Sequence, residues 1–249
     1  MSVQELPRDL QFLEHQVDER KRLLPPEELW ALSETLPRPR DLAEALIALS
    51  NRPVTYILSS EIGERSSHFA DTLMVSPEDL SLLGSLKAKT ACPTIAFWPL
   101  IDEYEVWEAR CLELDGVVID PKFHQLPKLQ YLIETCKEAS IEALLQIKSQ
   151  RDFDLALETD AKFLLIYQEG IDLSSAAEKL RRWGRGRLAI AALEKSNLMD
   201  VGKLRGLGYN CFYLNAKGDL PQEFIAEKSL ALTKRSPHER RSALQRFWR

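Results

Sequence analysis

Serine and histidine residues that could form a nucleophile–base pair are few in this chain and poorly placed. Ser59 and Ser60 have no histidine near them in the sequence. His68 and His124 follow early strand-like segments, yet neither has an evident acidic partner. We therefore expect surface or core histidines, and the spacing of these residues indicates no catalytic set.

The four cysteines also lack a spacing that binds metal. Cys92, Cys111, Cys136 and Cys211 are scattered, with no Cys-x-x-Cys pair and no histidine at ligand spacing. This predicts reduced core thiols rather than a zinc site or a disulfide framework. No metal and no cofactor is expected.

Composition describes a folded domain with a mild negative charge. The 249 residues include 33 Lys+Arg and 38 Asp+Glu, a formal charge of −5, which argues against a nucleic acid partner. Glu5 and Asp9 interrupt the opening where a signal peptide would be apolar, and no later run is long enough for a bilayer. We expect a cytoplasmic protein without a membrane partner.

Periodicity along the chain changes after residue 52. Three short amphipathic helices are predicted at 9–24, 26–36 and 41–50, separated by prolines and with Asp41 as a cap. Apolar runs of strand length then alternate with helical segments. The predicted strands are 54–58, 72–75, 94–97, 116–119, 143–147, 163–166, 188–191 and 211–214. The predicted helices between and after them are 77–87, 103–113, 126–139, 150–159, 174–183, 200–206 and 221–230.

Eight strands alternating with helices predict an α/β protein of the (βα)8 TIM barrel type, with an open doubly wound sheet as the alternative. We expect one domain over 1–249, with a helical extension at 1–52 and the barrel at 53–232. Ser59 and Phe97 are only 38 residues apart, where two average units of such a barrel span about 62. The first βα unit should therefore be shortened and the rim open there.

Residues 236–249 form a predicted extra helix, opened by a capping box at Ser236 with proline at the next position. Arginines surround Leu244, Phe247 and Trp248. An RNA, membrane or protein contact is one interpretation. The favoured one is a terminal helix that docks Leu244 and Phe247 and points its arginines at water.

One segment resembles a known family. Residues 93–110 read Pro-Thr-Ile-Ala-Phe-Trp-Pro-Leu-Ile-Asp-Glu-Tyr-Glu-Val-Trp-Glu-Ala-Arg. This is similar to the third-strand signature of indole-3-glycerol phosphate synthases, typically Pro-Val-Leu-Arg-Lys-Asp-Phe-Ile-Ile-Asp-Pro-Tyr-Gln-Val-Tyr-Glu-Ala-Arg. Shorter matches are Pro39-Arg40-Asp41-Leu42, Ala45-Leu46, Ala161-Lys162, Asp172-Leu173, Asp200-Val201 and Leu207-Gly208. The resemblance implies the barrel and the helical extension.

Enzymes of that family close an indole ring by decarboxylating and dehydrating a carboxyphenylamino-deoxyribulose phosphate. The reaction uses a lysine general acid, glutamates, an orienting amide and a glycine-rich phosphate cradle at the strand ends. The resemblance carries these catalytic positions onto Ser59, Glu61, Phe97, Gln146, Gln168 and Ala192. A phenyl ring at position 97 cannot donate a proton, and an amide at position 146 keeps size without basicity.

Two residues offer a partial substitute for the missing groups. Glu194 would replace the seventh-strand glutamate if the register slipped by two residues, although a solvated loop charge is the favoured interpretation. Lys217 and Gly218 are a weak phosphate-binding candidate beside Asn215. Glu61 and Glu64 would meet a phosphate with two negative charges, which disfavours anion binding.

Three function classes follow from this pattern. The leading hypothesis is a pseudoenzyme, a synthase-like barrel that binds a protein partner or a small-molecule ligand at its mouth. Phe97, Trp98 and Tyr167 would then form an aromatic surface there, unless Phe97 and Trp98 only fill the core. The alternatives are an active synthase of tryptophan biosynthesis and a barrel enzyme acting on an unphosphorylated or cationic substrate.

Overall fold

The structure is a computed structural model. It describes residues 6–47, 55–59, 70–89, 92–183, 187–194, 201–209 and 211–215. The predicted helices at 221–230 and 236–249, and residues 60–69 of the first βα unit, lie outside these ranges. The shortened first unit and the domain boundaries therefore stay predictions.

Three helices precede the first strand, as the sequence predicts. They are α1 (Leu6–Leu23), α2 (Pro26–Thr35) and α3 (Leu42–Ile47). Proline at the first position of α2 suits its fixed backbone angle to a helix start. The Asp41 carboxylate accepts the Glu44 backbone N–H at 2.6 Å and caps α3.

Eight parallel strands pair in chain order, and the last pairs with the first. Tyr56 stands opposite Phe212 in that closing pair. Closure makes this a TIM-barrel-like fold and overturns the open doubly wound alternative. The strands are β1 (Thr55–Ser59), β2 (Thr72–Val75), β3 (Thr94–Ala96), β4 (Gly116–Ile119), β5 (Glu142–Ile147), β6 (Phe163–Tyr167), β7 (Leu188–Glu194) and β8 (Cys211–Asn215).

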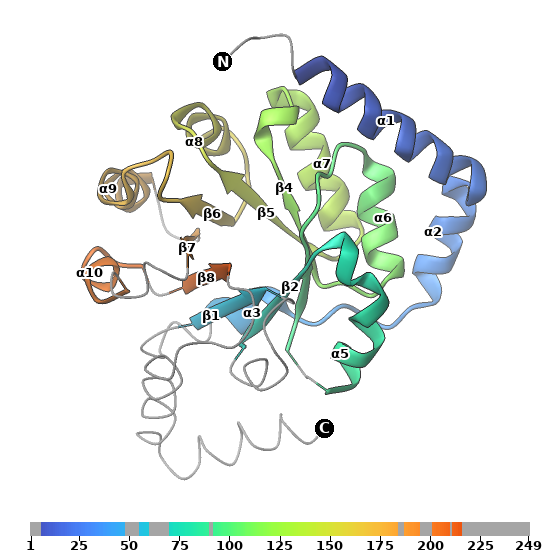
Figure 1. Cartoon of the computed structure of the whole chain (residues 1–249), viewed down its shortest axis with the longest axis horizontal. Coiled ribbons are helices and arrows are strands. Elements are labelled where there is room, and N and C mark those ends of the chain that lie inside the picture. The colour runs from blue at the N-terminus through green and yellow to red at the C-terminus, as the bar shows by residue number, and fades with distance from the viewer. Residues whose placement is uncertain are drawn as a thin grey trace.

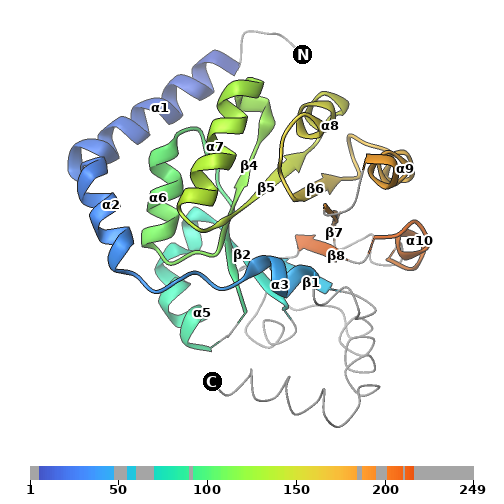
Figure 2. The ribbon, with the colours of Figure 1, turned by 180° about the vertical axis from the view of Figure 1, so that it is seen from behind.

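Helices surround the strands on the outside (Figure 1). They are η2 (Pro77–Leu82), α5 (Leu83–Lys89), α6 (Glu103–Cys111), η3 (Pro121–Phe123), α7 (Leu126–Glu138), α8 (Gln150–Leu157), α9 (Leu173–Trp183) and α10 (Val201–Gly206). One helix, or a 3-10 turn and a helix, follows each strand from β2 to β7, which is the alternation that the hydrophobic pattern predicts. The view from behind shows α1 and α2 running outside α6 (Figure 2).

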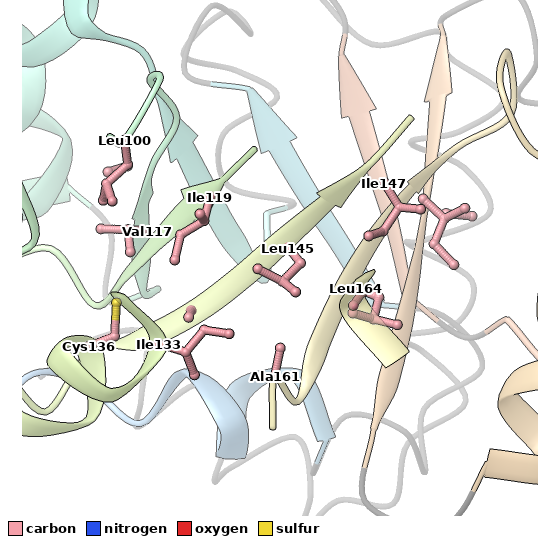
Figure 3. Close-up of a cluster of buried hydrophobic side chains, with 14 of the residues drawn as sticks. Leu100, Val117, Ile119, Ile133, Cys136, Leu145, Ile147, Ala161 and Leu164 are labelled. Carbon is pink, nitrogen blue, oxygen red and sulfur yellow. The ribbon is translucent and has the colours of Figure 1, made fainter. Parts of the chain in front are cut away.

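The strands separate two apolar layers, because successive side chains point to opposite faces. The outer layer packs against the helices, and Ile133 and Cys136 of α7 contact it (Figure 3). The strand residues that Figure 3 labels in this layer are Val117, Ile119, Leu145, Ile147 and Leu164. Their near-zero exposure explains why the strands read as uninterrupted apolar runs.

The inner layer fills the barrel, and α3 closes its amino-terminal end. Leu42 and Leu46 of α3 pack in the same cluster as Ile57, Met74 and Ile95. Gly116 opens β4 directly beneath this helix, and a Cβ atom there would lie 2.8 Å from Leu42 Cδ2. Side chains therefore occupy the lower barrel, and chemistry is confined to the opposite end.

Part-buried polar contacts attach the extension to α6. The Tyr104 hydroxyl lies 2.9 Å from the Leu24 carbonyl oxygen and 3.2 Å from that of Arg20. The Arg20 guanidinium bonds Glu105 at 2.7 Å and Glu108 at 3.1 Å. The helix that most resembles the synthase signature thus carries contacts that hold the scaffold together.

Candidate functional site

We call the end of the barrel formed by the carboxyl ends of the strands the mouth. Ligands of parallel α/β barrels bind there, because loops of variable sequence meet at that end. Three residues that the resemblance assigns to catalytic positions lie at that end of their strands: Phe97, which follows β3, Gln146 of β5 and Ala192 of β7. Each stands two residues after an inner-layer residue of its own strand, and alternate residues of a strand share a face, so all three belong to the inner face.

An aromatic and apolar surface takes the place of the expected acid–base groups. Phe97 is half-buried and packs against the inner layer, with its ring centroid 6.0 Å from that of Tyr213. Ala192 stands opposite Tyr167 on one side and Tyr213 on the other. A phenyl ring and a methyl group supply no proton at these two positions.

The remaining predicted residues are placed differently. Gln168 is exposed and lines an open groove of about 590 Å³ between the β6–α9 connection and α10, while Tyr167 packs on the inner layer. Ser59 ends β1 opposite Met74. Glu61, Lys217 and Gly218 lie outside the described residues.

Glu194 requires a correction of the predicted secondary structure. The sequence places it in a loop after a strand ending at 191, whereas β7 continues to Glu194, which pairs with Asn215 of β8. Pairing with β8 extends β7, because Leu193 and Glu194 align with Leu214 and Asn215. Glu194 was predicted to lie in a loop because the predicted strand ended at residue 191, before the end of β7.

Two charged residues at the mouth were not predicted from the sequence. Asp120 follows β4 and Lys148 follows β5, each two residues beyond an inward residue, Val118 and Gln146. The Lys148 Nζ atom lies 4.0 Å from Asp120 Oδ2 and 5.2 Å from the centroid of the Tyr167 ring. Both could have been predicted from the sequence by continuing the alternation of inner-face residues past the end of each strand.

The Asp120 carboxylate is nearly buried and well supplied with donors. Its side chain is 9% exposed, and its Oδ1 accepts the Lys122 backbone N–H at 3.0 Å. The Lys122 ammonium lies 3.8 Å from Oδ2. A backbone N–H group and an ammonium group therefore both face the Asp120 carboxylate.

Gln146 and Tyr167 form the inner wall of this cluster. Gln146 is 5% exposed, and its side-chain amide lies beside the Tyr167 phenol. Burial raises the pKa of Tyr167 to about 12, and the adjacent Gln146 amide acts in the opposite direction. Tyr167 is therefore a neutral phenol at pH 7, able to donate its proton in a hydrogen bond.

Backbone contacts hold Lys148 in place. Its N–H donates to the Asp152 carboxylate at 3.2 Å, and the Ser149 hydroxyl accepts the Asp152 N–H at 3.2 Å to cap α8. Gly170 passes so close that a Cβ atom there would lie 1.7 Å from the Lys148 carbonyl oxygen. The connections after β5 and β6 are thereby fixed to each other.

The other aromatic and titratable candidates lie away from the mouth. Trp98 packs on the outer layer, so it does not join Phe97 and Tyr167 in one aromatic surface. His124 is buried, its Nε2 lies 2.9 Å from the Leu100 carbonyl oxygen, and burial lowers its pKa. It is a core histidine, as predicted, while His68 lies outside the described residues.

Cysteines and acidic residues form no metal-binding group within the described ranges. None of the four cysteines forms a disulfide: Cys136 and Cys211 are buried, and Cys92 and Cys111 are half-buried. Burial raises the pKa of the Cys136 thiol well above its usual range, so it stays protonated. No helix in the described ranges combines the length and the apolar character that crossing a bilayer requires.

Sequence comparison finds distant relatives of a single class. The chain is 24% identical to the indole-3-glycerol phosphate synthase of Chromobacterium violaceum over 132 residues, half of each chain. It is 23% identical to that of Magnetococcus marinus over 139 residues (54% of this chain and 52% of the relative). It is 26% identical to indole-3-glycerol phosphate synthase 2 of Streptomyces coelicolor over 140 residues (53% and 52%).

The chain thus spans about half the length of the curated relatives it matches, and no family model matches it. Distant homology to these synthases agrees with the parallel barrel and with the signature at 93–110. The protein is an indole-3-glycerol phosphate synthase-like barrel.

Proposed function

We propose that this barrel is a pseudoenzyme: it retains the synthase scaffold, lacks the indole-forming activity, and works by binding a ligand at its mouth. The observation that carries the proposal is Phe97, which packs on the inner layer where the synthase signature has its lysine. No other described residue supplies an ammonium group from β3.

The size of the catalytic loss supports the proposal. One general acid or base contributes about 10²–10⁴ to a rate, and residues that act as a unit are not replaced singly. Phe97, Gln146 and Ala192 replace a lysine and two glutamates at the positions that the resemblance assigns. Losing these groups together would leave no useful fraction of the original rate.

The charged cluster favours a second candidate function. Asp120, Lys148 and Tyr167 bring a carboxylate, an ammonium group and a neutral phenol to one end of the barrel. A different reaction, on an unphosphorylated substrate, is therefore the alternative to pure binding. An active synthase is the third candidate, and it would require groups beyond the described ranges, such as Glu61 or Lys217.

A synthase assay tests the proposal directly. The full chain is expressed in a tryptophan auxotroph that lacks the synthase, and purified protein is incubated with carboxyphenylamino-deoxyribulose phosphate. We expect no growth without tryptophan and no indole-3-glycerol phosphate. Growth together with product formation by the purified chain would overturn the pseudoenzyme proposal, and an active synthase from a relative provides the positive control.

A further inference from the structure

We infer that the exposed face of α1 and α2 is a docking surface, and that its occupant is the basic segment 234–249 of the same chain. The inference concerns the helical extension and is independent of what binds at the mouth. Residues 234–249 lie outside the described ranges, so the support comes from the surface itself and from the composition of the segment.

Large apolar side chains are concentrated on the outside of the extension. Of the six large hydrophobic side chains that are exposed within the described ranges, four belong to α1 and α2: Phe12, Leu23, Trp30 and Leu32. Leu23 is 85% exposed and Leu32 is 50% exposed. Single exposed apolar residues are ordinary on a protein surface, whereas a group of them on two adjacent helices marks an interaction site.

Phe12 and Leu23 share one face of α1. They are separated by three helical turns, with Gln16 and Glu19 between them at the i+4 and i+7 positions. The inward face contains Val17, which is buried in the cluster that joins the extension to α6. Because α1 and α2 run outside α6 (Figure 2), the extension keeps its own core contacts and still presents apolar side chains outward.

The exposed part of these two helices is also acidic. Between residues 10 and 35 the exposed carboxylates are Glu14, Asp18, Glu19, Glu27, Glu28 and Glu34. The exposed basic residues there are Arg22, which pairs with Glu19, and His15. Arg20 and Lys21 are less exposed and pair with carboxylates of α6. An occupant of this surface must therefore be cationic as well as apolar.

A second copy of the same surface does not meet that requirement. A two-fold dimer through α1 and α2 would place each group of carboxylates against its equivalent on the other chain. Like charges in contact repel, and the repulsion grows as water is excluded from between them. The occupant must carry the opposite charge, and the chain contains such a segment after its last strand.

Residues 234–249 meet both requirements. They contain Lys234 and five arginines against a single acidic residue. Leu244, Phe247 and Trp248 are spaced by three and four residues, as on one face of the predicted helix. The 18 residues between β8 and this segment can span up to about 60 Å, in a domain whose radius of gyration is about 18 Å. The segment is therefore long enough to reach the extension of its own chain.

Photo-cross-linking in the full chain tests this arrangement. One variant is Leu23→p-benzoylphenylalanine and another is Leu32→p-benzoylphenylalanine, and the irradiated proteins are digested and analysed by mass spectrometry. We expect cross-links to residues 234–249 within single chains. Their yield should be several-fold higher than from Tyr131→p-benzoylphenylalanine, which places the same group at an exposed ring of α7.

Charge reversal provides a second measurement in the same assay. Glu27→Arg with Glu28→Arg should lower the yield from position 32 roughly fivefold or more, since one exposed ion pair contributes up to about fivefold in an equilibrium constant. Arg240→Glu with Arg241→Glu should have the same effect. Combining all four substitutions should restore most of the yield, because opposite charges again face each other.

Glu134→Arg with Glu138→Arg, at exposed positions of α7, is the matched control and should leave the yield unchanged. Circular dichroism checks that every variant is folded. The inference is overturned if positions 23 and 32 give no cross-link to residues 234–249, if position 131 gives an equal yield, if the cross-links join two chains, or if neither charge reversal lowers the yield. The synthase assay is unaffected by these outcomes, because no variant changes a residue of the mouth.

Discussion

Gly170 and Lys148 come into backbone contact across the ends of β5 and β6: a Cβ atom on Gly170 would lie 1.7 Å from the Lys148 carbonyl oxygen. No side chain is accommodated at that separation, so position 170 requires glycine for space. The contact involves backbone on both sides and cannot be relieved by a rotamer change.

Gly170→Ala should therefore lower the free energy of unfolding by roughly 2–4 kcal/mol, because the two connections must move apart. Urea denaturation followed by circular dichroism measures the change. Gly84→Ala is the matched control, since no atom outside its own turn of α5 lies within 4 Å of its Cβ position. Alanine should raise helix stability there by up to about 1 kcal/mol. Equal effects at the two positions would contradict the close approach.

Tyr104→Phe tests the attachment of the helical extension. The change removes the hydrogen bond to the Leu24 carbonyl at 2.9 Å and the longer contact to Arg20 while keeping the ring. We expect a loss of about 1–2 kcal/mol in urea denaturation. Proteolysis should also cut faster within residues 6–24. Tyr131→Phe, at a half-exposed ring on α7, is the control; equal loss in both would argue against the attachment.

Glu108 should make stability depend on pH in the opposite direction from most carboxylates. Burial raises its pKa from 4.5 to about 7, with Arg20 acting against that shift. The folded state therefore keeps the proton that the unfolded state releases near pH 4.5. This contribution to stability is complete below pH 4.5 and is lost as pH rises through 7.

Wild type and Glu108→Gln should accordingly be compared by urea denaturation at pH 5 and pH 8. The stability of wild type relative to the variant should fall by roughly 1–3 kcal/mol between these values. Taking the difference removes the contribution of other titrating groups. A relative stability that stays constant or rises with pH would contradict the raised pKa.

Phe97→Lys tests whether the missing lysine alone explains the missing chemistry. The variant should form no indole-3-glycerol phosphate, because Gln146 and Ala192 still occupy the assigned glutamate positions. It should also lose about 2–4 kcal/mol, since an ammonium group enters the half-buried inner layer. Phe97→Leu should lose less. Measurable product formation by the lysine variant would show that the remaining mouth is competent.

Strands that are buried on both faces were predicted correctly from the sequence. Strands such as Gly116–Ile119 and Phe163–Tyr167 are buried on both faces, so their composition alone identifies them. The boundary of β7 was wrong because Glu194 reads as a polar loop residue. Pairing with Asn215 of β8, distant in sequence, keeps it in the strand.

The site was predicted only in part, because pairing between strands brings some of its residues together. Phe97 and Ala192 were identified through the family resemblance, which assigns positions already known to be catalytic. Asp120 and Lys148 have no counterpart in the motifs compared, and each stands one residue past the end of its strand. Their 4.0 Å approach depends on the parallel pairing of β4 with β5, which single-segment patterns do not contain.

The junction between α1 and α6 changes what similarity at residues 104–110 can tell us. Tyr104 and Glu108 contact the extension, and Arg110 donates to the carbonyl of Pro37 at 2.8 Å. These contacts are architectural demands that persist whether or not the barrel turns over a substrate. Proteins found by their similarity to this helix will therefore share the way in which the extension attaches to the barrel. Their activities must be judged from the residues at the mouth.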